Sequence, residues 1–160
     1  MTGSPSHGDA VHQLDGHLDD AVHRYYLRVQ YEDTDAGGIV YHAQYLAFAE
    51  RARSAWLRCL WIDQQALLDS DGNGFVVRHI DIDFLQAAAL SAVLEITSEV
   101  MKTGGASVKL RQTITNMQSC HIVARLVVDI GFVNLQSAGA ARACRMPQDI
   151  RDKLAGGSQA

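Results

Sequence analysis

The sequence predicts a single α+β domain in which an antiparallel sheet of five strands wraps around one long helix. Five segments alternate apolar and polar residues, one stretch repeats apolar residues at helical spacing, and short turn sequences join consecutive strand segments. A chain of 160 residues can bury most of one core but rarely divides into two domains. The domain is expected to cover residues 23–155.

Residues 1–22 are rich in Gly, Ser, Asp and His and carry few large apolar groups. Such a segment cannot offset the entropy of becoming ordered, so the sequence predicts a disordered N-terminal tail. The spacing of the nearby histidines fits neither one face of a helix nor a zinc motif. These histidines are His7, His12, His17 and His23.

The first strand is expected to begin at Tyr26, because Leu27, Val29 and Tyr31 then share one face. After a turn-rich stretch, apolar residues recur at helical spacing and predict a helix over residues 43–60. On this helix Glu50 and Arg53 are three residues apart, so we expect them to form an ion pair.

Four more strands are predicted at about residues 75–85, 92–101, 106–115 and 121–133. Apolar residues on one face of these strands alternate with charged residues on the other, so the long helix should cover the apolar face. Pro147 predicts a short C-terminal helix that runs through Leu154.

Composition excludes several classes of function. A net charge of -4 argues against a duplex-binding surface, so no nucleic-acid partner is expected. Cys59, Cys120 and Cys144 are odd in number and widely spaced, which favours neither a disulfide framework nor a zinc knuckle. Without a long apolar run or a signal-peptide pattern, we expect no membrane insertion and a cytoplasmic location.

The segment from Tyr31 to His42 concentrates the chemistry, since two aspartates, paired glycines and a histidine fall within the ten residues from Asp33 to His42. Gly37 and Gly38 allow positive φ and close approach of another molecule. The amides that follow open a helix, where free N–H groups and the helix dipole can stabilise an oxyanion. Acyl-thioester hydrolysis needs such donors and an activating carboxylate, for which Asp35 is the candidate.

Two other interpretations of this segment remain. Asp33 and Thr34 could simply cap a turn whose dihedral angles the glycines satisfy. Calcium is a weaker alternative, because Asp33 and Asp35 occupy positions one and three of an EF-hand loop. In that loop Gly37 and Gln44 would occupy two positions that must supply calcium ligands, and neither carries a carboxylate. No metal site is therefore expected.

At this segment the chain resembles the 4-hydroxybenzoyl-CoA thioesterase family of hotdog-fold proteins, especially its YbgC-type branch associated with the Tol-Pal system. The resemblance is carried by Val29-Gln30-Tyr31-Glu32-Asp33-Thr34-Asp35-Ala36-Gly37-Gly38-Ile39-Val40-Tyr41-His42, by Tyr45-Leu46-Ala47-Phe48 and by Glu50-Arg51-Ala52-Arg53. Further similarity lies in Phe75-Val76-Val77-Arg78 and Leu94-Glu95-Ile96. It spans roughly residues 26–133 and implies a hotdog fold.

The resemblance also implies roles for individual residues. The family's catalytic aspartate falls on Asp35, and its carbonyl-binding amide falls on His42. Substrate contacts are expected from Gly38, Ile39, Val40, Tyr41 and Arg78. Arg78 is one candidate partner for the CoA phosphates, together with Lys102, Arg111, Arg142 and Arg145.

The function that the resemblance implies is hydrolysis of short- to medium-chain acyl-CoA, including hydroxyacyl or aromatic members. Acyl carrier protein is a further possible partner, and no cofactor is expected because CoA is part of the substrate. Such proteins form homodimers or homotetramers with active sites at the dimer interface. The alternative is a non-catalytic hotdog protein that binds acyl carriers as a scaffold for envelope or phospholipid synthesis.

Overall fold

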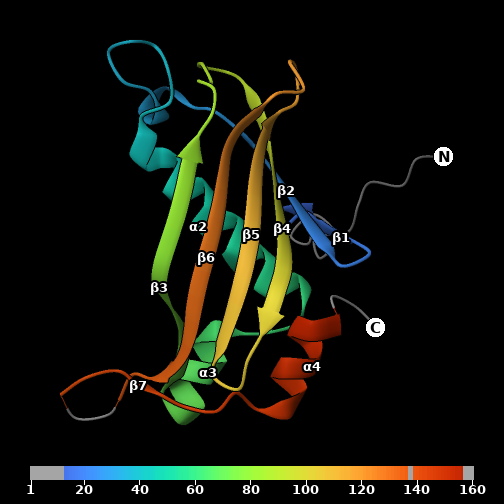
Figure 1. The fold of residues 1–160 in the computed structure, drawn as a ribbon, viewed down its shortest axis with the longest axis vertical. Coiled ribbons are helices and arrows are strands. Elements are labelled where there is room, and N and C mark those ends of the chain that lie inside the picture. Colours follow the sequence, from blue (N-terminus) through green and yellow to red (C-terminus); the bar gives the residue numbers. More distant parts are fainter. Residues whose placement is uncertain (1–12, 137–138, 157–160) are drawn as a thin grey trace.

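The computed structural model describes residues 13–136 and 139–156, and its main layer is one antiparallel sheet (Figure 1). The strand order is β1-β2-β4-β5-β6-β3, and β7 also pairs with β6. The strands are β1 (His17–Asp19), β2 (Val22–Arg28), β3 (Asn73–Phe84), β4 (Val93–Thr103), β5 (Ser107–Asn116), β6 (Ile122–Asn134) and β7 (Arg142–Ala143). The helices are α2 (His42–Cys59), α3 (Gln64–Asp71) and α4 (Gln148–Gly156).

The long helix and four of the five expected strands lie where the sequence predicts them. β3, β4, β5 and β6 match the predicted segments within three residues, and α2 begins one residue earlier than expected. β4–β5 and β5–β6 are antiparallel pairs joined by short turns, as the turn sequences predict. The C-terminal helix after Pro147 is confirmed as α4.

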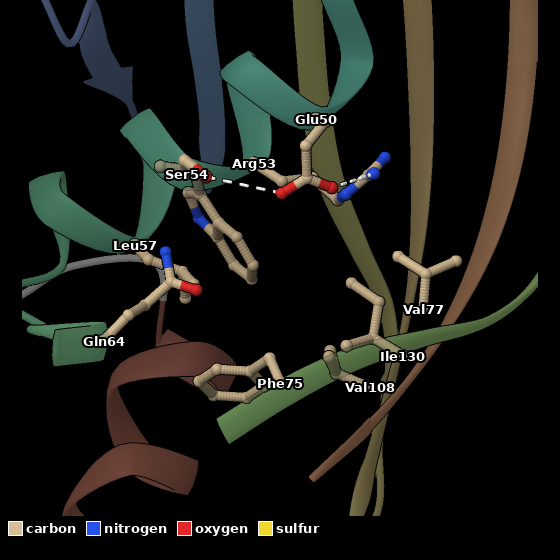
Figure 2. Close-up of a pocket in the computed structure, with 10 residues that line it drawn as sticks. Glu50, Arg53, Ser54, Leu57, Gln64, Phe75, Val77, Val108 and Ile130 are labelled. Atoms are coloured by element: carbon tan, nitrogen blue, oxygen red, sulfur yellow. Dashed lines mark hydrogen bonds and ion pairs between the residues drawn. The ribbon is translucent and has the colours of Figure 1, made fainter. Parts of the chain in front are cut away.

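The polar side of α2 contains the expected ion pair. The Arg53 guanidinium contacts the Glu50 carboxylate, and Ser54 lies on the other side of that carboxylate (Figure 2). The prediction from their spacing is confirmed.

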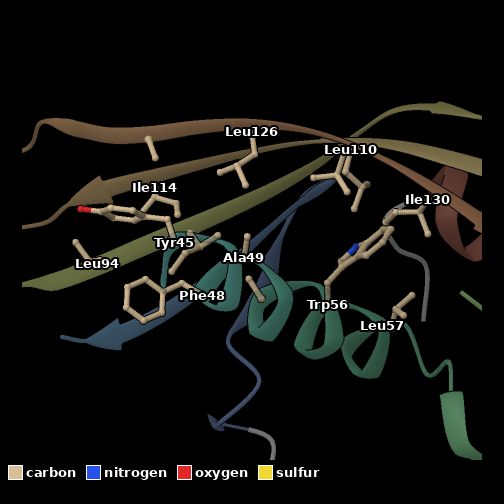
Figure 3. Packing of buried hydrophobic residues seen from close by; sticks show 14 of the residues in the cluster. Tyr45, Phe48, Ala49, Trp56, Leu57, Leu94, Leu110, Ile114, Leu126 and Ile130 are labelled. Atoms are coloured by element: carbon tan, nitrogen blue, oxygen red, sulfur yellow. The ribbon is translucent and has the colours of Figure 1, made fainter. Parts of the chain in front are cut away.

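The apolar side of α2 packs against the inner face of the sheet, where side chains from β4, β5 and β6 meet it (Figure 3). Phe48, Ala49 and Ala52 are fully buried, and Trp56 is 2% exposed. The small alanines let the helix approach the strands closely, while the aromatic rings fill the space on either side. This packing makes α2 a rigid platform for the loop that precedes it.

The first predicted strand is misplaced. β2 covers Val22–Arg28, whereas Tyr31–Asp33 form a 3₁₀ turn, η1. The Asp33 carboxylate accepts a hydrogen bond from the Gln30 amide at 2.7 Å, which closes this turn. Tyr31 is therefore 83% exposed instead of facing the sheet.

The predicted disordered tail is wrong for its last residues. β1 pairs with β2 from His17 to Asp19, and residues 1–12 lie outside the described part of the chain. Contacts with distant residues hold this segment, because Asp15 forms an ion pair with Arg58 and its carbonyl bonds the buried His23 ring. Composition cannot reveal such long-range partners.

Two short elements have no counterpart in the sequence prediction. The Asp63 carboxylate caps α3 by accepting hydrogen bonds from the Gln65 and Ala66 amides, and Gly72 ends this helix at φ 67°. β7 extends the sheet beside the end of β6. No helix in the described part of the chain is long and apolar enough to cross a membrane.

Candidate active site

The loop between η1 and α2 is a tight, cross-bonded turn. Thr34 and Val40 form an antiparallel bridge, the Asp35 amide donates to the Ile39 carbonyl at 2.9 Å, and the Gly38 amide donates to the Asp35 carbonyl at 3.0 Å. Gly38 has φ +76°, a conformation that disfavours residues with a Cβ atom. The glycine is thus required by the backbone that presents Asp35.

The two acids of this segment have different surroundings. Asp33 is 3% exposed, and its carboxylate accepts a hydrogen bond from the Gln30 amide. The Asp35 side chain is exposed, and its Oδ1 accepts a hydrogen bond from the Gly37 amide at 2.8 Å. Among described residues Oδ2 of Asp35 has no hydrogen-bond partner, so this oxygen is available to a ligand or water. Asp33 has the turn-capping role that the sequence left open for it.

The start of α2 provides free backbone donors. Tyr41 is the N-cap and makes no side-chain capping bond, and the first turn contains no acid. The Tyr41 amide donates a hydrogen bond to the Asp33 carbonyl at 2.9 Å. The amides of His42 and Ala43 have no acceptor within the described part of the chain. With the helix dipole they form a site that can stabilise developing negative charge on an oxygen.

A cleft of about 260 Å³ adjoins the helix start and is lined by His42, Tyr45, Phe84 and the residues that follow Phe84. The His42 ring packs edge-on against the Phe84 ring at 6.1 Å and lies 4.5 Å from the Tyr41 ring. The Tyr45 hydroxyl accepts a hydrogen bond from the Ala88 amide at 3.2 Å, and burial raises the pKa of Tyr45. This bond ties α2 to the strand connection that forms the wall of the cleft.

The structure brings together most of the residues predicted for the site. Asp35, Gly38, Ile39, Tyr41 and His42 lie on one exposed turn. Val40, by contrast, is 4% exposed and its amide bonds to the Ala88 carbonyl, so it also anchors the turn to the core.

Arg78 lies apart from this turn within one chain. It occupies a β-bulge between Val77 and His79, six residues before the end of β3 at Phe84. That separation is roughly 20 Å along a strand. Its side chain is exposed and its Cδ lies over Gly131.

Sequence reasoning missed Phe84 and Ala88 as parts of the site. Both lie more than forty residues from Asp35 along the chain, and no motif marks them. Among residues 13–136 and 139–156, His, Cys, Asp and Glu side chains form no cluster that could hold a metal ion.

The model of the thioesterase-like superfamily matches residues 29–154 of this chain. The chain belongs to this superfamily. Over 125 residues it is 38% identical to the acyl-CoA thioesterase YbgC of Haemophilus influenzae, covering 78% of this chain and 88% of that protein. Over 102 residues it is 42% identical to the acyl-CoA thioester hydrolase YbgC of Escherichia coli O157:H7, covering 64% of this chain and 75% of that protein.

Two solved structures align with this fold over most of the chain. A probable thioesterase from Bartonella henselae aligns with a TM-score of 0.70 at 33% identity, covering 79% of this chain and all of that one. A 4-hydroxybenzoyl CoA thioesterase mutant complexed with 4-hydroxybenzoyl CoA aligns with a TM-score of 0.78 at 16% identity, covering 84% and 99% of the two chains. The resemblance to YbgC-type thioesterases and the predicted α+β hotdog fold are confirmed.

Proposed function

We propose that this superfamily member hydrolyses acyl-CoA to a free acid and CoA. The observation that carries the proposal is the exposed Asp35 carboxylate on the same turn as the unpaired amides of His42 and Ala43. The names of the relatives support the same substrate class, since they are acyl-CoA thioesterases. Acyl carrier protein presents its acyl group on the same kind of thioester, so it is a second substrate to test.

In the proposed reaction, Asp35 acts as a general base. Its carboxylate takes a proton from a water molecule, whose oxygen attacks the thioester carbonyl carbon. The tetrahedral intermediate places its negative oxygen against the helix-opening amides, which donate hydrogen bonds to it. The C–S bond then breaks, the CoA thiolate leaves, and the proton held by Asp35 returns to that sulfur.

The proposed chemistry needs no metal or redox cofactor, because water is the only co-reactant and a thiolate leaves readily. The His42 imidazole is secondary to its backbone amide in this scheme. A substrate carried on CoA fits the expected cytoplasmic location, which cell fractionation would test.

We also propose that the active unit is a homodimer formed along β3. This strand is twelve residues long and lies at one edge of the sheet (Figure 1), where unpaired backbone groups favour pairing with a second chain. Val77 and Phe84 on it are 42% and 49% exposed. Light scattering should give the mass of a dimer, or of a tetramer if two dimers associate.

The decisive experiment measures thiol release from acyl-CoA by the wild type and by Asp35→Asn. Asparagine can still accept the Gly37 hydrogen bond, so folding and acyl-CoA binding should persist while turnover falls by about 10²- to 10⁴-fold. His42→Ala should reduce turnover less, because the backbone amide remains. Substantial activity in Asp35→Asn would remove this residue from the chemistry. Acyl-CoA binding without turnover by the wild type would favour a scaffold instead.

A further inference from the structure

Tyr45 is buried on the first turn of α2, close to the proposed oxyanion donors. It is 4% exposed and lies three residues after His42, so the two side chains share one face of the helix. Its ring packs near Phe48 and Phe84, with ring centroids 6.1 and 5.9 Å away. A buried tyrosine hydroxyl usually has a hydrogen-bond partner, and the position of that partner determines what Tyr45 can do.

The hydroxyl joins α2 to the connection between β3 and β4. It accepts a hydrogen bond from the Ala88 amide at 3.2 Å, and Ala88 is itself 1% exposed. Within the described part of the chain this is the one hydrogen bond between α2 and residues 85–92. A buried amide is costly to leave without an acceptor. The hydroxyl therefore holds the connection against the helix.

The same connection holds the catalytic turn. The Ala88 carbonyl accepts a hydrogen bond from the Val40 amide at 2.8 Å, and Ala89 forms an antiparallel bridge with Ile39. The Ile39 carbonyl in turn accepts a hydrogen bond from the Asp35 amide at 2.9 Å. Through Ala88, the hydroxyl on α2 is thus linked to the backbone of the proposed general base.

This link closes a ring around the junction between the turn and the helix. Residues 39–40 hold the segment that carries the acid, and α2 carries the amides of His42 and Ala43. Tyr41 separates the two parts along the chain, and its φ and ψ angles set their relative direction. The Tyr45 hydroxyl joins the two parts from the other side, so it restricts the angle between the acid and the donors.

We infer that Tyr45 is a positioning residue for thioester hydrolysis, an inference that rests on the proposed thioesterase function. Its hydroxyl holds residues 85–92 against α2 and so aligns the helix-opening amides with the water that Asp35 activates. An oxyanion donor is effective when it lies about 2.7–3.1 Å from the developing charge, and a displacement of about 1 Å can cost about 10²-fold in rate. The alignment therefore acts on the transition state and not on substrate binding.

The test compares Tyr45→Phe with the wild type in a thiol-release assay on the full-length protein. Butyryl-CoA, decanoyl-CoA and benzoyl-CoA are screened first, and the substrate that the wild type cleaves fastest is used. Phenylalanine keeps the ring and its packing but leaves the Ala88 amide without its acceptor. We expect kcat to fall by about 10- to 100-fold, while KM changes by less than about threefold.

The matched control is Tyr26→Phe, which also deletes one tyrosine hydroxyl. The Tyr26 hydroxyl donates to the Glu95 carboxylate at 2.8 Å across the β2–β4 pair, and Tyr26 is 42% exposed. This variant should keep kcat within about twofold of the wild type. An equal loss of kcat in Tyr26→Phe would overturn the inference, because the effect would not be specific to the Ala88 link.

Restoring stability separates a positioning role from a merely structural one. Tyr45→Phe should lower Tm by about 2–8 °C, because a buried amide loses its partner. Sucrose is then added until the Tm of the variant equals that of the untreated wild type. The loss of kcat relative to the wild type in the same sucrose should persist, since the angle between the acid and the donors does not depend on the folded fraction. Recovery of kcat in sucrose would overturn the inference.

Amide hydrogen exchange of the wild type tests the link even if Tyr45→Phe fails to fold. The Ala88 and Val40 amides should exchange at least about 100-fold more slowly than the same amides in an unstructured peptide. Exchange of the Ala88 amide at the unprotected rate would show that the hydroxyl does not hold the connection.

Three kinetic results distinguish this inference from the proposed function. Wild-type kcat in Tyr45→Phe would overturn the positioning role and leave the thioesterase intact. A KM raised about tenfold at unchanged kcat would do the same, because the hydroxyl would then act on substrate binding. If the wild type releases thiol from no acyl-CoA, the proposed function itself fails and the inference fails with it.

Discussion

Replacing Asp33 by asparagine tests whether the two acids of the catalytic turn have separate roles. The buried Asp33 carboxylate accepts a bond from the Gln30 amide at 2.7 Å, and the Asp33 carbonyl accepts one from the Tyr41 amide at 2.9 Å. Asparagine keeps the shape of the side chain but removes its charge. The variant therefore weakens the closure of the turn and leaves Asp35 in place.

The magnitude follows from the loss of a charge-assisted hydrogen bond. Such a bond contributes about 1.5–3 kcal/mol and a neutral one about 0.5–1.5 kcal/mol, so Asp33→Asn should lower the free energy of unfolding by about 1–2 kcal/mol. For a chain of this size that loss corresponds to about 2–8 °C in Tm. Asp35→Asn alters an exposed side chain, so its effect on stability should stay within about 0.5 kcal/mol.

Calorimetry and thiol release together provide the assay, with turnover measured well below both Tm values. Asp33→Asn should be less stable yet lose less than about tenfold in kcat, whereas Asp35→Asn should be stable and lose about 10²-fold or more. The opposite pattern would refute the assignment of roles: an unchanged Tm with abolished turnover in Asp33→Asn would make Asp33 the reacting acid.

Two further predictions concern pH and the turn backbone. Burial lowers the pKa of His23 below its ordinary 6.5, and its Nδ1 is buried without a partner among described residues. The free energy of unfolding should therefore keep its full value above pH 6.5 and decrease as the pH falls toward the lowered pKa, because protonation of His23 then favours the unfolded chain. Urea midpoints at pH 7.5 and 5.5 would measure this loss, and an equal loss in His23→Gln would disprove it. Gly38→Ala places a Cβ at φ +76° with no heavy atom within 4 Å, so backbone strain alone should cost about 1–2 kcal/mol. An unchanged Tm and kcat in that variant would show that the turn does not require glycine.

The strands that sequence predicts well are those with local signals. β4, β5 and β6 alternate apolar and polar residues and are joined by short turns, so each strand and its pairing follow from neighbouring residues. The strand placed at Tyr26–Glu32 fails because alternation continues through Tyr31 and Glu32, while the Asp33 carboxylate closes a turn there. The alternation of apolar and polar residues does not reveal a competing hydrogen bond of this kind.

The short strand β1 was missed because the contacts that order it come from residues far away in the sequence. Its residues have the composition of a mobile tail, yet Leu18 packs against the core and Arg58 pairs with Asp15 across 43 residues of chain. A segment with few apolar groups can be ordered when an existing surface supplies the contacts. Those contacts are invisible to a composition argument.

By itself, the sequence determined that a glycine-kinked turn carrying two acids precedes an amphipathic helix, because these features depend on residues close together in the chain. Only the tertiary structure decided which acid is buried and which is exposed, since burial of Asp33 depends on how the turn packs. It also decided that Arg53 meets Gln112 inside the core and that Phe84 lies beside His42. Such contacts form when the sheet closes over α2 and brings together side chains that no sequence spacing relates.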